Sequence, residues 1–303
     1  MTNDRVFLKT ETRMSPLQTA LSQVQGVVGV AARHLETGKE VRHNADSVFF
    51  TASTLKVPVL VELYRQVDQG IIDVNERVTL TDAHRAPGGG VLKELANGLQ
   101  LTIYDLAMMM IIISDNSATD ILYDLVGRDN LKHTLQHLEL TQTHIRMSCR
   151  ELLYSICGLD TTNPSHTFEL ASDRLRRQQF ALEADAFSED TSDVSSPDDM
   201  CSLMSLIDSG EILAPPSQRA VIDILKRQQL NNIIPYALPP GTETAHKTGT
   251  YHSVRCDVGI VFSPVGTYAV AIMAKEIRCD DQLLLDASLA AVSRAIYDEL
   301  TVC

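Results

Sequence analysis

Segments that favour β-strands lie at both ends of the chain and enclose a long middle that favours helices. Alternating and β-branched residues predict two strands near the start and three near the end, at 27–34, 40–44, 242–250, 255–262 and 267–274. Helices are predicted before and after them, at 17–24 and 281–300. Because strands from both ends must meet in one sheet, we expect an α+β fold in which 1–50 and 241–303 form a discontinuous α/β half.

The middle, 51–240, is predicted to form a helical half. Apolar residues recur there at helical spacing in six segments, at 55–67, 102–113, 118–126, 130–138, 197–209 and 218–228. The polar and acidic stretch 159–195 interrupts this pattern and is interpreted as an insertion with one helix at 167–181. We expect a functional site in the cleft between the two halves.

Charge and hydropathy exclude several functions. The net charge is −13, and the 26 Lys and Arg residues are scattered, which disfavours nucleic acid as a partner. The apolar run 106–113 is too short to cross a bilayer, so no membrane association is expected. The charged segment 1–10 lacks an apolar signal core, which predicts a cytoplasmic protein.

Metals, cofactors and disulfides are not expected. The chain has no His-Glu-x-x-His pattern and no phosphate-binding loop, and Gly88-Gly89-Gly90 is interpreted as a flexible turn. Its six cysteines form no Cys-x-x-Cys pair, so free and mostly buried thiols are predicted, although a disulfide framework stays open. They are Cys149, Cys157, Cys201, Cys256, Cys279 and Cys303.

Three short motifs in one order carry the chemistry: Ser53-Thr54-Leu55-Lys56, Ser114-Asp115-Asn116 and Lys247-Thr248-Gly249. A Ser-x-x-Lys match alone is close to chance, and each of the other two arises in only about one such chain in twenty. Taken singly, they would be a helix cap, a turn between helices and an edge strand. Their joint appearance, on a predicted helix, helix end and strand, indicates an active site.

Ser53 is the expected nucleophile, because Lys56 lies one helical turn away and can take its proton. The lysine must then be neutral, so its pKa must fall from ~10.4 towards 7. Burial and a second cation, Lys247, would both lower it. Ser114 can relay a proton, Asn116 can hold a substrate carbonyl, and Gly249 lets a substrate approach the strand.

This set resembles the class A β-lactamases and penicillin-binding proteins, and the resemblance extends from about Val27 to Tyr297. It implies the β-lactamase/transpeptidase-like fold, an antiparallel sheet flanked by helices with an inserted all-helical half. It also implies that Ser53 is acylated and that Lys56 and Ser114 handle protons. The substrate is expected along Asn116, Lys247, Thr248, Gly249, Thr250 and Arg255, with the backbone N–H groups of Ser53 and Thr250 as the oxyanion hole.

In that family a glutamate activates the water that releases the acyl group. The corresponding position falls near Glu151, which is our candidate, but Tyr154-Ser155 replaces the usual Leu-Asn and the chain has no Trp. A solvated helix carboxylate is the competing interpretation of Glu151. Without a carboxylate at the acyl group, turnover would be slow.

The predicted function is hydrolysis of a cyclic amide, a β-lactam, through an acyl-enzyme at Ser53. A D-alanyl-D-alanine peptidase or esterase on the same fold, with slow β-lactam release, is the alternative. A non-catalytic ligand-binding module is the third, and the complete set of Ser53, Lys56, Ser114 and Lys247 argues against it. In each case the expected partner is a small molecule with an acyl amide or ester group.

Overall fold

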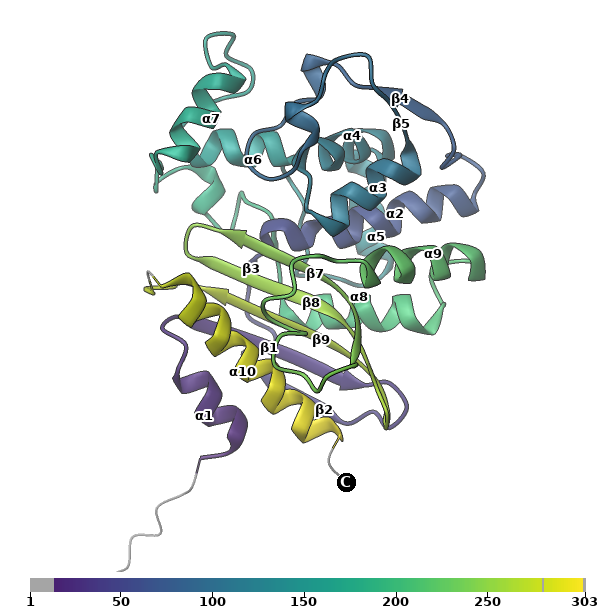
Figure 1. Cartoon of the computed structure of the whole chain (residues 1–303), viewed down its shortest axis with the longest axis vertical. Coiled ribbons are helices and arrows are strands. Elements are labelled where there is room, and N and C mark those ends of the chain that lie inside the picture. Colours follow the sequence, from purple (N-terminus) through teal and green to yellow (C-terminus); the bar gives the residue numbers. More distant parts are fainter. Residues whose placement is uncertain (1–13, 280, 302–303) are drawn as a thin grey trace, which may run out of the picture.

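The computed structural model describes residues 14–279 and 281–301, so the predictions on 1–10 and on Cys303 lie outside the described residues. A five-stranded antiparallel sheet in the order β2-β1-β9-β8-β7 forms the lower part of the molecule (Figure 1). Its strands are β1 (Val27–His34), β2 (Glu40–His43), β7 (Glu243–Tyr251), β8 (Val254–Ser263) and β9 (Gly266–Lys275). Strands β1 and β9 pair directly, so both ends of the chain share one sheet and the predicted α+β class is confirmed.

The two faces of the sheet are covered by different helices. Alternate side chains, such as Val30 and Ile272, point towards α1 (Pro16–Ser22) and α10 (Gln282–Thr301). The opposite face, which includes Met273, packs into the larger core shared with the helical part. Period-2 alternation in the sequence therefore builds two apolar layers on the two sides of a single sheet.

The helical part lies above the sheet in Figure 1. Its helices, and α8, which packs on the sheet, are α2 (Lys56–Asp68), α3 (Ile103–Ile112), α4 (Asn116–Val126), α5 (Arg128–His137), α6 (Cys149–Ile156), α7 (Phe168–Arg176), α8 (Pro197–Ser209) and α9 (Pro215–Lys226). Two short ladders complete it, β3 (Phe49–Phe50) with β6 (Val194–Ser195) and β4 (Arg77–Thr79) with β5 (Gln100–Thr102). Four single turns of 3₁₀ helix are η1 (Ala52–Leu55), η2 (Asp82–His84), η3 (Leu92–Glu94) and η4 (Asp185–Phe187).

The described residues also bear on the predictions about membranes, metals and disulfides. Over 14–279 and 281–301, no helix is long and apolar enough to cross a membrane, and no group of His, Cys, Asp and Glu residues could hold a metal ion. Within the same ranges the five cysteines are free thiols, and all but Cys279 are buried.

Candidate active site

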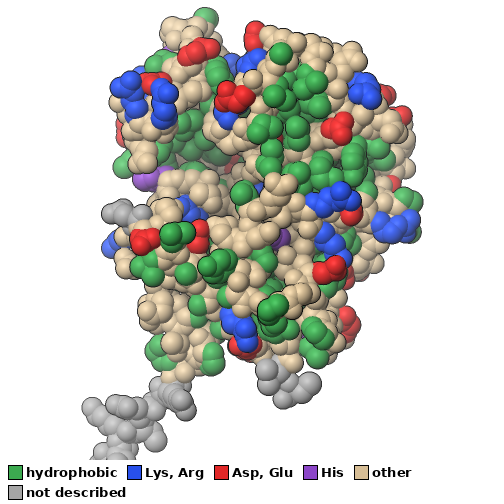
Figure 2. Space-filling model, viewed as in Figure 1, with side chains coloured by type: hydrophobic (Ala, Val, Ile, Leu, Met, Phe, Trp, Pro, Cys, Tyr) green, Lys and Arg blue, Asp and Glu red, His purple; other side chains and the backbone are tan. Residues whose placement is uncertain are grey.

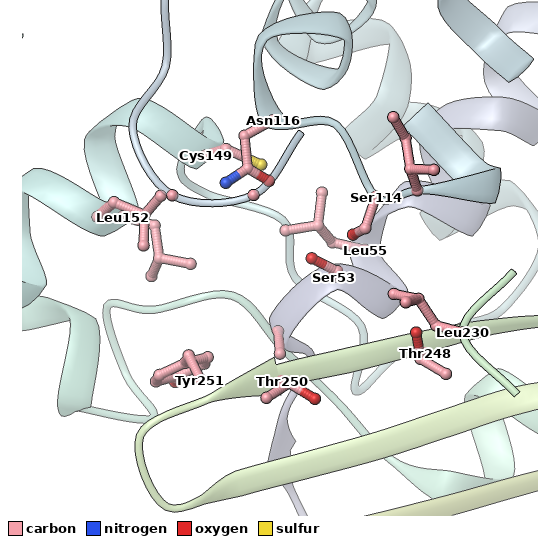
Figure 3. Close-up of a pocket in the computed structure, with 15 residues that line it drawn as sticks. Ser53, Leu55, Ser114, Asn116, Cys149, Leu152, Leu230, Thr248, Thr250 and Tyr251 are labelled. Atoms are coloured by element: carbon pink, nitrogen blue, oxygen red, sulfur yellow. The ribbon is translucent and has the colours of Figure 1, made fainter. Parts of the chain in front are cut away.

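A cavity of about 280 Å³ lies between the helical part and strand β7, with Ser53 at its centre (Figure 3). Six segments far apart in the sequence contribute to it: η1, the loop at 88–89, the turn before α4, the start of α6, the loop at 230 and the edge strand β7. The lining residues are Ala52, Ser53, Leu55, Gly88, Gly89, Ile113, Ser114, Asn116, Cys149, Leu152, Leu153, Leu230, Thr248, Thr250 and Tyr251.

Lys56 is fully buried and joins the first two motifs. Its Nζ donates to the Ser114 carbonyl at 2.8 Å, to Ser114 Oγ at 3.0 Å and to Asn116 Oδ1 at 2.8 Å. Burial lowers the pKa of Lys56, because the charged form loses its hydration. The amine thus has the direction of shift that a proton acceptor at neutral pH requires.

The nucleophile lies on a short turn of tight geometry. Ser53 was predicted to open a helix, and it lies in the 3₁₀ turn η1, which runs directly into α2. In a 3₁₀ turn residues i and i+3 eclipse, so Ser53 and Lys56 stay on one side. Ala52, just before the nucleophile, has a φ of 44°, a left-handed conformation that an alanine rarely adopts and that only the surrounding packing can hold.

Strand β7 passes very close to this turn at Gly249. A Cβ on Gly249 would lie 2.7 Å from the Thr51 carbonyl oxygen and 3.0 Å from the Ser53 nitrogen. Only a residue without a side chain therefore fits between the strand and the turn. This approach brings β7 close to the backbone nitrogen of Ser53, and Thr250, the next residue along β7, lines the same cavity as Ser53. The oxyanion hole expected from the N–H groups of these two residues stays a prediction.

Lys247 is fully buried in β7, and its Nζ donates to the Thr248 carbonyl at 2.7 Å. Burial, followed by the nearby charge of Lys56, holds the pKa of Lys247 well below its usual range. We expected Lys247 to lower the pKa of Lys56, but burial is what lowers the pKa of Lys56, and the repulsion between the two amines acts on the pKa of Lys247. Two lysines in one dry site disfavour each other's charge.

Asp115 holds the loop at 88–92, which forms one wall of the cavity. Its carboxylate accepts the backbone N–H of Val91 at 2.6 Å and of Leu92 at 2.9 Å, and that of Ala118 at the start of α4. A Cβ on Gly90 would lie 2.3 Å from the Asp115 carboxyl carbon, so the loop needs glycine there. The middle residue of Ser-Asp-Asn therefore positions the loop that carries Gly88 and Gly89.

Glu151, the candidate for deacylation, does not line the cavity. Its carboxylate accepts from Arg128 at 2.7 Å and from the backbone N–H of Ser148 at 2.8 Å. Ser148 in turn accepts from the Glu151 N–H, which completes a capping box at the start of α6. The glutamate is thus turned back onto the end of its own helix, in agreement with the competing interpretation as a partly solvated carboxylate.

Cys149 faces the cavity from α6 instead. Its backbone N–H and that of Arg150 are held by the two carboxylate oxygens of Asp120, at 2.7 and 2.8 Å. Burial raises the pKa of the Cys149 thiol to about 12 and that of Asp120 to about 6. The side chain that this wall presents to the cavity is consequently a neutral thiol. Neither Cys149 nor Asp120 was predicted to be a site residue.

Arg255 is also directed away from the cavity. It is buried on β8, its Nη1 donates to the Val254 carbonyl at 2.8 Å, and its Nε lies 3.8 Å from Asp286 of α10. Arg255 was expected to contact the substrate, but its side chain does not line the cavity. The remaining wall is apolar, and Leu152, Leu153, Leu230 and Tyr251 form most of it.

The fold and the arrangement of Ser53, Lys56 and Ser114 define the class of proteins that have a reactive serine on the β-lactamase/transpeptidase-like fold. The model of the β-lactamase enzyme family matches residues 12–300, and the chain belongs to that family. Among curated proteins, a β-lactamase regulatory protein, BlaB, from Streptomyces cacaoi is 23% identical over 97% of this chain and 99% of its own length.

Two solved structures extend the comparison. A β-lactamase from Sphaerobacter thermophilus is 27% identical, covers 95% of this chain and 96% of its own, and has a TM-score of 0.77. A mutant of PBP-A, in an acyl-enzyme complex with penicillin G, is 28% identical with a TM-score of 0.73, covering 93% of this chain and 95% of its own.

Proposed function

We propose that the protein reacts with β-lactams and related acyl donors through an acyl-enzyme at Ser53, and that it releases the acyl group slowly. The observation that carries the proposal is the composition of the cavity wall. Ser53 and Ser114 line one cavity and the Ser114 hydroxyl accepts from the buried Lys56 amine, which supports acylation, but among residues 14–279 and 281–301 no carboxylate lines the cavity.

Acylation needs a base, an oxyanion site and room for the acyl group. Lys56, with its lowered pKa, is proposed to accept the Ser53 proton, and Ser114 to pass it to the leaving nitrogen or oxygen. The N–H groups of Ser53 and Thr250 are proposed to stabilise the oxyanion. Asn116, whose Nδ2 already donates to Pro87, has one amide hydrogen left for a substrate carbonyl.

Release of the acyl group needs a water that is activated close to the ester. The Cys149 thiol, with a pKa raised to about 12, is neutral at physiological pH and is a poor acceptor for a water proton. Glu151 is engaged by Arg128 and Ser148, so it is not proposed to take this role. A long-lived acyl-enzyme follows from these two observations.

Intact-protein mass spectrometry after exposure to benzylpenicillin tests the proposal. We expect an adduct of one penicillin on the wild type that persists after removal of free drug, and none on Ser53→Ala. Rapid, continuous penicillin hydrolysis without an accumulating adduct would contradict slow release, and the absence of both adduct and hydrolysis would contradict acylation.

A regulatory role is the second candidate. The neutral Cys149 thiol favours this role too, because slow release leaves a persistent acyl-serine that would mark the presence of a β-lactam. The name of the S. cacaoi relative, a β-lactamase regulatory protein matched over nearly the whole chain, supports it as well. The lifetime of the adduct separates this role from that of an efficient hydrolase.

A further inference from the structure

The insertion predicted at 159–195 packs against one end of the active-site cleft. It carries α7 and η4 and is fastened to α6 by two hydrogen bonds, from the Ala181 N–H to the Ile156 carbonyl at 2.9 Å and from the Ala186 N–H to Ser155 Oγ at 3.1 Å. Because α6 also supplies part of the cavity wall, the insertion is held in a fixed position relative to the cavity.

Four aromatic side chains connect the insertion to the tip of the β7–β8 hairpin. The ring of Phe187 lies 6.3 Å from that of Tyr251 and 5.7 Å from that of His252, and the ring of Phe180 lies 5.1 Å from that of His252. These spacings and the tilted or edge-on orientations are those that aromatic pairs favour. We call Phe180, Phe187, Tyr251 and His252 the aromatic clasp.

The clasp adjoins the cavity through Tyr251, which belongs to both. One side of Tyr251 lines the cavity that contains Ser53, and the residue also packs with Leu152, Leu153 and Phe187 in a single apolar cluster. A salt bridge between Lys275 of β9 and Glu189 holds the insertion to the sheet beside it. Hydrophobic side chains also border the recess between the two parts of the molecule in Figure 2.

We infer that the aromatic clasp closes the end of the cleft towards which β7 runs, and that Ser53 is therefore acylated by donors with compact, apolar acyl groups. This inference rests on the proposed function. An extended peptide that followed β7 would meet Tyr251 and the insertion. Its backbone amides would also face a wall of leucine side chains without hydrogen-bond partners, which is unfavourable. A compact apolar group gains from the same wall.

The test compares the acylation rates of two p-nitrophenyl esters, of butyric acid and of an N-acetylated tripeptide. We expect the butyrate to acylate the wild type at least about tenfold faster, a ratio typical of steric discrimination in a pocket. In the double variant Phe180→Ala and Phe187→Ala the ratio should approach one, through a gain on the peptide ester. Neither phenylalanine lines the cavity, so the butyrate rate should stay within about threefold of the wild type.

Phe262→Ala is a control for the loss of a phenylalanine ring outside the clasp, because Phe262 lies at the other end of β8, where it packs under Lys226. If the double variant does not fold, His252→Gly removes part of the clasp and relieves the left-handed φ of 36° at that residue. Equal wild-type rates for the two esters, or an unchanged ratio in a folded clasp variant, would overturn the inference alone. No acylation of the wild type by either ester would overturn the proposed function together with it.

Discussion

The close approach of β7 to the nucleophile predicts a specific effect of Gly249→Ala. The added Cβ would lie 2.7 Å from the Thr51 carbonyl oxygen, so the strand and the turn must separate by about 0.7 Å to reach the 3.4 Å of ordinary contact. Both neighbours are backbone, and η1 is anchored by the Thr51 N–H, which donates to the Asp193 carbonyl at 3.0 Å. Neither side yields easily.

That separation displaces the expected oxyanion donors relative to Ser53. A misplacement of this size lowers the acylation rate about 10- to 100-fold. Overpacking also costs about 1–3 kcal/mol of stability, which lowers the melting temperature by roughly 2–10 °C. Stopped-flow acylation by nitrocefin and thermal unfolding measure the two effects.

Gly89→Ala is the control for this experiment. It also adds a methyl group to a lining residue, but the nearest atom would be the Ser114 carbonyl oxygen at 3.4 Å, an ordinary contact. We expect its acylation rate to stay within a few-fold of the wild type. An acylation rate in Gly249→Ala equal to that of Gly89→Ala would refute the argument from close approach.

Three further predictions concern titratable and wall residues. Cys149→Glu, which adds a carboxylate to the cavity wall, should shorten the lifetime of the penicillin adduct by about 10²-fold or more, measured by mass spectrometry. Cys149→Gln and Glu151→Gln should leave the lifetime unchanged. An unaltered lifetime in Cys149→Glu would contradict the argument that the missing carboxylate makes release slow. The acylation rate should rise with pH and then level above the lowered pKa of Lys56, and Lys56→Arg should lose about 10²-fold or more; a flat profile would argue against a neutral amine. Burial raises the pKa of Asp193 to about 7, so its bound proton stabilises the fold at low pH, and this contribution is lost as the pH rises from 4 to 7. Asp193→Asn should remove this pH dependence from the free energy of unfolding measured in urea, by roughly 1.4 kcal/mol per unit of pKa shift. Parallel plots of unfolding free energy against pH for the wild type and the variant would contradict it.

The sequence predicts well which motif residues lie near Lys56, because their positions follow from short-range rules. The spacing of Ser53 and Lys56 places them within one turn, and the expected partnership of Ser114 with Lys56 agrees with the hydrogen bond between the Ser114 hydroxyl and the amine. The contact of Asn116 with the same amine was not predicted, because Asn116 was expected to hold a substrate carbonyl. Strand bounds were also close, since period-2 alternation marks buried strands, and 27–34 coincides with β1. The division into halves at 50 and 240, and the location of the protein in the cell, stay predictions.

The choice of Glu151 shows where residue type alone misleads. Distance along the chain pointed to this glutamate, but the Ser148-Cys149-Arg150-Glu151 sequence is itself a capping-box pattern, which turns the carboxylate back to its helix end. That signal was present and predicts that Cys149, two residues earlier, faces another side. The orientation of Arg255 was less accessible, because its partner Asp286 lies on a helix 31 residues further along the chain.

The pairing of β1 with β9 has a consequence for biosynthesis. Strand β9 begins at Gly266, 232 residues after β1 ends at His34, so during translation β1 leaves the ribosome long before its partner exists. Until then its unpaired edge is free to pair wrongly or to bind a chaperone. Completion of the central sheet, and with it the seat of Gly249 against the nucleophile, is therefore a late event in the making of each molecule.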